Sequence, residues 1–269
     1  MLRTPSFWGA FFVLENIYKK IVLFMLKHFK YFEEISEYYS FSDSQNYLEP
    51  HVSYAENKHV SRYNKKYYKE YLTFNVTTNG SIYWKASDAN STKTISYSKD
   101  FGMTWTAITS TTAGVSISVS SGDTVMFKGD NVTYGNDTYY NTFSGTTCQF
   151  NLDGNIMSLL FNDNFAYKKM LPSNYTFRNL FMGCTGLTSA ENFVLPSTAL
   201  TEGCYMYMFS GCSSLNYIKC LATDISATNC TYNWVYDVSS SGTFIKNSNM
   251  SDWTTGDNGI PSGWTVQDA

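Results

Sequence analysis

The chain has 269 residues, a net charge of −3, 17% aromatic residues and only 15% charged residues. This length accommodates one large domain or two modest ones. Residues 1–70 carry 10 Lys and Arg against 8 Asp and Glu, whereas residues 71–269 carry 9 against 14, so the acidic part is not expected to bind nucleic acid, which needs a basic face.

Residues 1–69 are expected to form a helical and extended arm that docks on a partner. Apolar residues recur between Phe7 and Phe32, but Lys and Glu interrupt them before any run reaches the ~18 residues of a membrane span. The pattern fits an amphipathic docking helix or a helix on a membrane surface, and it lacks the features of a secretory signal. The sequence leaves open whether the chain starts at Met1 or Met25.

The rest of this arm is aromatic, polar and poor in aliphatic residues. Segments 51–54 and 59–63 predict a hairpin. The stretch resembles connector segments of Bacteroidetes proteins and of structural proteins of their phages. It has too few aliphatic residues to build its own core, so we expect it to extend along a partner.

Residues 70–135 are predicted to form a small β domain. Apolar and polar residues alternate in five segments separated by turn residues, at 71–76, 81–84, 93–97, 115–119 and 124–127. Short strands at this spacing indicate a small β-sandwich or open barrel.

One hairpin of this domain carries a recognisable motif. Residues 98–105 read Ser-Lys-Asp-Phe-Gly-Met-Thr-Trp, which resembles the Asp-box, S-x-D-x-G-x-T-W, of sialidases and other β-propellers. Asp100 can accept N–H groups across the turn, and Gly102 can adopt a positive φ. The resemblance implies that Ser98, Asp100, Gly102 and Trp105 form a structural staple away from any active site.

After a linker at 131–145, residues 146–269 contain a repeat. Segments 180–187 and 208–215 match, with Cys184 and Cys212 separated by 28 residues, and a second register returns after 26 residues between Cys204 and Cys230. Such periods are typical of stacked solenoid coils, which must cover one another's apolar faces. Phe181 and Phe209 are expected inside this stack. Residues after Val238, with Trp253 and Trp264, are expected to cap it.

The repeated segment Met208-Phe-Ser-Gly-Cys-Ser-Ser-Leu-Asn-Tyr-Ile218 resembles the core of BspA-like leucine-rich repeats, known from surface proteins of gut Bacteroidetes. The resemblance covers residues 155–265 and implies a binding or adhesion surface. The predicted fold class is therefore mainly β, with a small β-sandwich-like domain, a short leucine-rich-repeat solenoid and an N-terminal arm.

The six cysteines lie in or beside the repeats, without the spacing of a zinc site. We expect buried, reduced thiols, with a disulfide between Cys184 and Cys212 or between Cys204 and Cys230 as the alternative. No metal or other cofactor is expected.

An enzyme is the less favoured interpretation. The three histidines lie before residue 60, so the β units lack a Ser–His or Cys–His pair. Only three arginines occur, at positions 3, 62 and 178, and they are too scattered for the carboxylate-binding triad of a sialidase. A two-carboxylate glycosidase stays open as an unlikely alternative.

The favoured interpretation is a non-enzymatic recognition protein. Aromatic residues among hydroxyl and amide side chains suit a glycan or a protein epitope, and the candidates are Tyr205, Tyr207, Tyr232 and Trp234. Without an export signal, a phage virion component that binds a host surface glycan or protein is preferred to a bacterial cell-surface adhesin. The arm would attach it to the virion or cell-surface scaffold, and homo-oligomerisation stays open.

Overall fold

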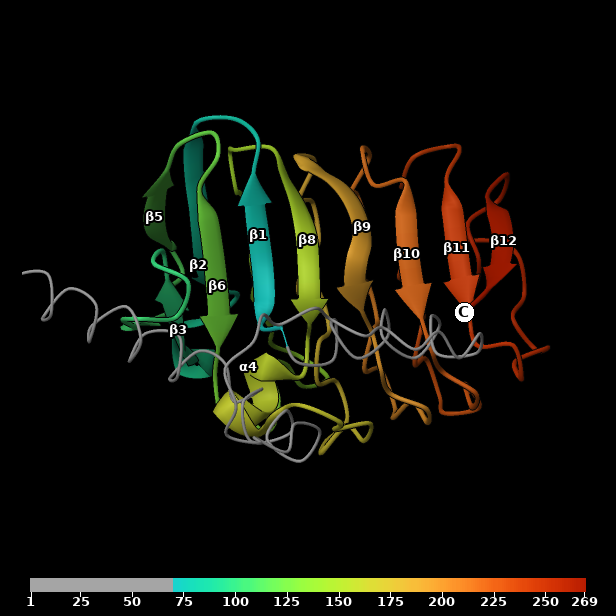
Figure 1. The fold of residues 1–269 in the computed structure, drawn as a ribbon. Coiled ribbons are helices and arrows are strands. Elements are labelled where there is room, and N and C mark those ends of the chain that lie inside the picture. The colour runs from blue at the N-terminus through green and yellow to red at the C-terminus, as the bar shows by residue number, and fades with distance from the viewer. Residues whose placement is uncertain (1–69) are drawn as a thin grey trace, which may run out of the picture. The chain divides into compact units, whose positions relative to one another are not determined.

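The computed structural model describes residues 70–269, and the predicted arm at 1–69, with its hairpin, lies outside the described residues. The described part is mainly β, as predicted (Figure 1). Its strands are β1 (Leu72–Val76), β2 (Gly80–Ala86), β3 (Thr94–Ser98), β4 (Thr106–Thr109), β5 (Val115–Val119), β6 (Thr124–Lys128), β7 (Asn141–Thr142), β8 (Phe150–Asn155), β9 (Leu187–Val194), β10 (Tyr217–Cys220), β11 (Thr243–Lys246) and β12 (Thr265–Asp268). Its short helices are η1 (Ala89–Ser91), α4 (Ser158–Phe161) and η2 (Asn162–Asn164).

The strands form one long row and a smaller sheet. The main sheet has the order β4-β3-β6-β1-β8-β9, and β10-β11-β12 continue the row (Figure 1). Pairing is antiparallel up to β1–β8 and parallel from β8–β9 onward. A parallel bridge between Leu195 and Cys220 connects β9 to β10. The predicted units at 70–135 and 146–269 are therefore two halves of one row of strands, joined where β1 pairs with β8.

The first half encloses an aromatic core between the main sheet and the sheet β5-β2-β7. Alternation predicts the buried faces: Ile82, Trp84 and Ala86 of β2 are buried, while the residues between them are half-buried. Phe74 of β1 stacks on Phe150 of β8, with ring centroids 4.4 Å apart. All five predicted strands are present. Sequence reasoning missed β4, which is largely exposed, and β7, which lies within the predicted linker.

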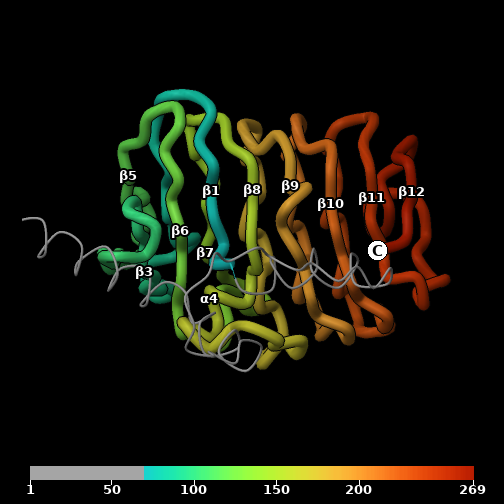
Figure 2. The backbone as a smooth tube through the Cα atoms, viewed as in Figure 1, coloured from blue at the N-terminus to red at the C-terminus, as the bar shows by residue number. Residues whose placement is uncertain are grey.

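In the second half, the chain leaves each strand, runs behind the row through a series of turns and comes back to form the next strand (Figure 2). We call these series of turns the turn segments. The turn segments are residues 174–183, 202–211 and 228–237. N–H groups at alternate positions of one segment donate to carbonyls of the next over 2.8–3.1 Å, as from Phe181 to Met208 and from Phe209 to Trp234. These ladders satisfy the backbone of segments that belong to neither helix nor strand.

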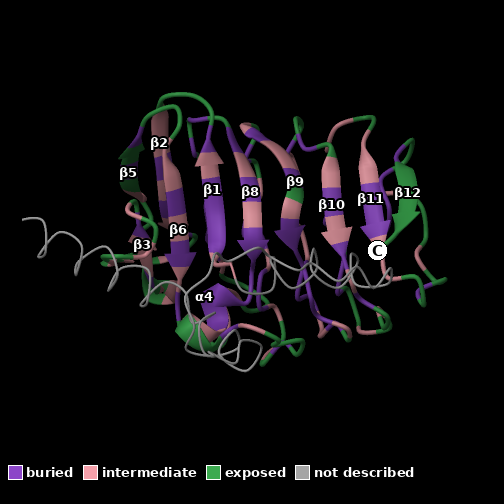
Figure 3. Cartoon of the chain, viewed as in Figure 1, coloured by how far each residue is buried: buried purple, intermediate pink, exposed green. Residues whose placement is uncertain are grey.

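Aromatic side chains fill the space between strands and turn segments. One column stacks Tyr134, Phe177, Tyr205 and Trp234, with centroids 6.2–6.3 Å apart. Another stacks Phe143, Phe181 and Phe209, with centroids 5.7 and 5.6 Å apart. Phe181 and Phe209 are fully buried, as predicted. Figure 3 shows buried residues in the strands of the row from β1 to β11, whereas β12 at the end of the row is exposed.

All six cysteines are free and buried. The reduced alternative is therefore the one that the structure contains, and the disulfides Cys184–Cys212 and Cys204–Cys230 are absent. Cys184 and Cys212 donate instead to the carbonyls of Phe143 and Phe181. Burial raises the pKa of Cys212 to about 12 and that of Cys220 to about 12, because the thiolate would lose its hydration.

Residues after Val238 cover the last turn segment. Trp253 stacks on Trp234 with centroids 5.5 Å apart, and the carbonyl of Gly259 accepts the indole N–H of Trp234. The carbonyl of Asn258 accepts the hydroxyl of Thr231. The loop at 254–260 therefore supplies hydrogen-bond acceptors to side chains of the last turn segment.

Candidate recognition surface

The three turn segments share a four-residue pattern that decides which side chains face solvent. Each segment contains units of four consecutive residues, in which the first two are buried, the third faces outward and the fourth has a positive φ. In the unit 204–207, for example, Tyr207 has φ 56°. Hydrogen bonds from residue i+3 to residue i close each turn, for example from Arg178 to Tyr175. We call the solvent-facing side of these segments the turn face.

Positive-φ positions recur at every fourth residue of each segment. They hold Asn, Gly or Asp, which tolerate this conformation, except at Tyr175 and Tyr207. The nine positions are Tyr175, Asn179, Gly183, Gly203, Tyr207, Gly211, Asn229, Asn233 and Asp237. A Cβ at Gly203 would lie 2.3 Å from Cδ1 of Tyr175. Gly203 therefore provides both the backbone conformation and the space that the Tyr175 ring occupies.

This pattern corrects part of the predicted binding set. Tyr205 and Trp234 are fully buried, so the prediction that they are exposed ligand-binding residues is wrong. Both occupy inward positions of the four-residue unit and build the aromatic column. Burial raises the pKa of the Tyr205 hydroxyl far above its ordinary value, because the phenolate would be desolvated.

The other two predicted residues do lie together on the turn face. The rings of Tyr207 and Tyr232 meet edge to face, with centroids 5.5 Å apart and an interplanar angle of 89°. Tyr232 is 38% exposed. Tyr207 adopts a left-handed conformation that is unfavourable for an aromatic residue by roughly 1–3 kcal/mol, so the stack holds this ring at the surface against a local cost.

Sequence reasoning missed several turn-face residues. Tyr236 follows Tyr232 by one unit and is 54% exposed. Arg178, two segments earlier at the position equivalent to Tyr232, lies 5.9 Å from the ring centroid of Tyr140. Glu202 accepts hydrogen bonds from Asn174 and from the hydroxyl of Tyr175. Gly, Asn and Asp at every fourth residue were the signal that could have located these positions.

The Asp-box residues form a compact hydrogen-bonded turn between β3 and β4. Asp100 accepts from the Ser98 hydroxyl at 2.6 Å and from the N–H and hydroxyl of Thr104 at 2.9 and 2.7 Å. These bonds, the Ser98 one foremost, lower the pKa of Asp100 to about 2. Gly102 has φ 84° and donates its N–H to the Ser98 hydroxyl.

Trp105 anchors this turn to the main sheet. Its ring lies 5.0 Å from that of Tyr71, and the Lys128 ammonium lies 4.3 Å from its centroid. Lys128 also forms an ion pair with Asp163 over 2.8 Å. The side chains of Ser98, Asp100 and Trp105 thus each have a partner within the fold, which fits the structural role that the motif implies.

Within residues 70–269, no group of three or more His, Cys, Asp or Glu side chains is arranged to hold a metal ion, and no helix of this part is long and apolar enough to cross a membrane. Comparison of the chain with family models, curated proteins and solved structures yields no match.

Proposed function

We propose that this protein is a non-enzymatic surface-recognition protein whose turn face binds a glycan or protein on a host cell surface. The observation that carries the proposal is the Tyr207–Tyr232 pair on consecutive turn segments, in which Tyr207 is half-buried and Tyr232 exposed, and which exposed Tyr236 extends. Open aromatic faces beside hydroxyl and amide groups suit sugar rings, which offer apolar C–H faces and polar edges.

The proposed architecture of this region is a short leucine-rich-repeat solenoid over residues 155–265. The offsets of 28 and 26 residues in the sequence, the parallel strands β9 to β12 and the ladders between turn segments support it. Stacked coils present equivalent side chains in register, as Arg178, Met206 and Tyr232 are here. A rigid row of this kind binds without losing much side-chain entropy.

The strain at Tyr207 supports a recognition role in preference to a packing role. Asn occupies the equivalent positions 179 and 233 and adopts the same conformation more easily. A tyrosine there costs stability and gains one edge-to-face contact with Tyr232. Residues kept in unfavourable conformations tend to cluster at functional sites.

The proposed setting is a phage virion, with a bacterial cell surface as the alternative. The sequence resemblances described above support both, and the N-terminal arm would then make the attachment to the scaffold. Immunogold electron microscopy of phage particles and of cells with an antibody against residues 70–269 would distinguish the two. Label on neither would contradict the proposed setting.

A glycan array tests the recognition role with the full chain. We expect Tyr207→Asn and Tyr236→Ala to weaken binding about tenfold or more, because aromatic contacts in binding sites are worth roughly 1–2 kcal/mol. Tyr167→Ala is the matched control, since Tyr167 is 56% exposed but lies outside the turn segments. Equal losses for all three variants, or no glycan or surface-protein ligand for the wild type, would refute the proposal.

Thermal unfolding separates binding from folding in this experiment. Tyr207→Asn removes strain of roughly 1–3 kcal/mol and an aromatic contact of roughly 0.5–1.5 kcal/mol. Its melting temperature should therefore equal or exceed that of the wild type while binding is lost.

A further inference from the structure

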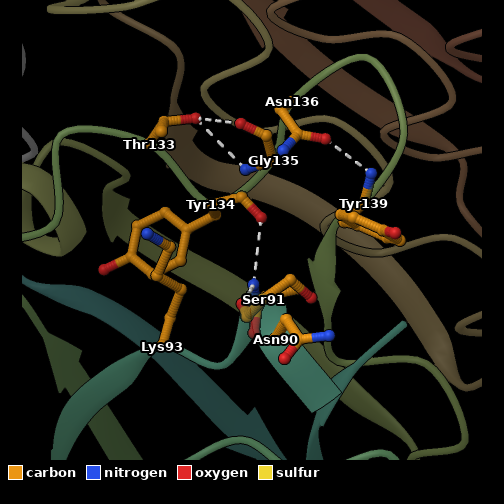
Figure 4. A pocket seen from close by; sticks show the side chains of 9 residues that line it. Asn90, Ser91, Lys93, Thr133, Tyr134, Gly135, Asn136 and Tyr139 are labelled. Atoms are coloured by element: carbon orange, nitrogen blue, oxygen red, sulfur yellow. Dashed lines mark hydrogen bonds between the residues drawn. The ribbon is translucent and has the colours of Figure 1, made fainter. Parts of the chain in front are cut away.

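An open pocket of about 170 Å³ lies between the segment at 90–93 and the loop at 133–141 (Figure 4). The side chains that matter here belong to Asn90, Lys93, Asn136 and Tyr139. The pocket adjoins the turn face, because Arg178 donates from Nη1 to the carbonyl of Asn136 over 2.7 Å. It is therefore continuous with the proposed recognition surface.

The loop that carries Tyr139 is held in place by the amide of Asn136. Its Oδ1 accepts the N–H groups of Thr138 and Tyr139 at 2.8 and 2.6 Å, which closes a tight turn. The hydroxyl of Thr133 donates to the carbonyl of Gly135 at the start of the loop. The Tyr139 ring is consequently presented at a defined position, with 38% of the residue exposed.

The opposite wall is fixed to the same loop by Asn141. Its Nδ2 donates to the carbonyls of Ser91 and Tyr134 over 2.7 and 3.2 Å, and its Oδ1 accepts the Ser110 hydroxyl. Asn141 is buried. Both walls are thus preorganised, which reduces the entropic cost of binding a ligand between them.

Several polar groups of this pocket have no partner within residues 70–269. They are the side-chain amide of Asn90, Nδ2 of Asn136, the hydroxyl of Tyr139 and the ammonium of Lys93. Other polar atoms of the pocket are used to hold the walls together. A pocket of this composition offers one aromatic face and several hydrogen-bonding groups to an incoming molecule.

Charge and size define the ligand further. The lining holds one ammonium group, and two carboxylates belong to residues that flank it: Asp88 accepts the N–H of Asn90, and Asp137 follows Asn136 in the loop. This balance disfavours an anionic ligand. The volume is about half of the ~300 Å³ at the lower end of pockets for drug-sized ligands, which is room for a single ring with small substituents.

We propose that this pocket is a subsite for one neutral sugar unit, whose ring packs on Tyr139 and whose hydroxyls bond to Asn90, Lys93 and Asn136. The choice of a sugar as ligand rests on the glycan recognition proposed above. The subsite would hold a terminal or branching unit of a glycan that continues along the turn face past Arg178.

Saturation-transfer NMR on the full chain tests the subsite with methyl glycosides of glucose, galactose and mannose as probes, and with glucuronate as the anionic comparison. We expect saturable binding of at least one neutral glycoside with a Kd on the order of 1 mM, as for a single-ring ligand. Tyr139→Ala should weaken it about tenfold, Asn90→Ala severalfold, and Tyr139→Phe least. Val132→Ala, directly before this loop and outside the pocket lining, should bind like the wild type.

Several outcomes would overturn the subsite: no saturable binding of any neutral glycoside, tighter binding of glucuronate than of every neutral glycoside, or unchanged binding by Tyr139→Ala. Tyr207→Asn separates the two proposals, because it alters the turn face and leaves the pocket intact. Loss of array binding with retained glycoside binding in this variant supports both. Array binding that survives Tyr207→Asn contradicts the turn-face proposal alone.

Discussion

Phe209→Ala is expected to destabilise the protein by about 4 kcal/mol. Phe209 is fully buried, stacks on Phe181 at 5.6 Å and packs against Trp234 at 6.2 Å. Truncation of a buried Phe typically costs about 3–5 kcal/mol, and each lost aromatic pair contributes roughly 0.5–1.5 kcal/mol of packing beyond buried area. The neighbouring rings cannot move together to fill the cavity that Phe209→Ala leaves, because backbone hydrogen bonds fix the turn segments on both sides.

Thermal and urea unfolding of the full chain, followed by near-UV circular dichroism, measures this cost. For a folded part of this size, about 4 kcal/mol corresponds to a fall in melting temperature of about 8–16 °C. Phe101→Ala is the matched control, since Phe101 is 63% exposed, and an exposed truncation should change stability by less than about 0.5 kcal/mol. Equal shifts for the two variants would refute the stacked interior.

Three further predictions concern other parts of the fold. Asp100→Ala should lower the melting temperature without affecting glycan binding. Because folding lowers the pKa of Asp100 to about 2, this carboxylate stabilises the folded state above its ordinary pKa of about 4, and the stabilisation is lost as the pH falls toward 2. A wild-type melting temperature that does not change between pH 5 and 2 would contradict this. Gly203→Ala should lower the melting temperature more than Gly122→Ala, because both glycines have a positive φ but only at Gly203 would the new Cβ meet a ring. Adding Tyr175→Ala to Gly203→Ala should remove the part of the loss that the ring causes. Finally, the six thiols should resist alkylation in the native protein and react in denaturant, measured by mass spectrometry, because they are buried with raised pKa values; rapid native labelling would contradict their burial.

Sequence patterns were most informative where one physical period dominates. Alternation located β1, β2, β3, β5 and β6, because one face of each strand packs on the core. The hydrogen-bonded turn at 98–104 could be predicted from sequence because Ser98, Asp100, Gly102 and Thr104 bond to one another within seven residues. By contrast, β4 and β7 lack alternating apolar residues, and the pairing of β1 with β8 joins residues more than seventy positions apart.

The sequence alone is enough to predict the mainly β class, the 28-residue offset and the inward position of Phe181 and Phe209, since repeated apolar residues must cover one another. It did not show which aromatic residues face solvent. That depended on the four-residue turn unit, in which a shift of two positions moves a side chain from the surface at Tyr232 to the core at Trp234. The pocket at Tyr139 depends likewise on tertiary structure, because its walls come from separate segments that the pairing of β2 with β7 and the Asn141 hydrogen bonds bring together.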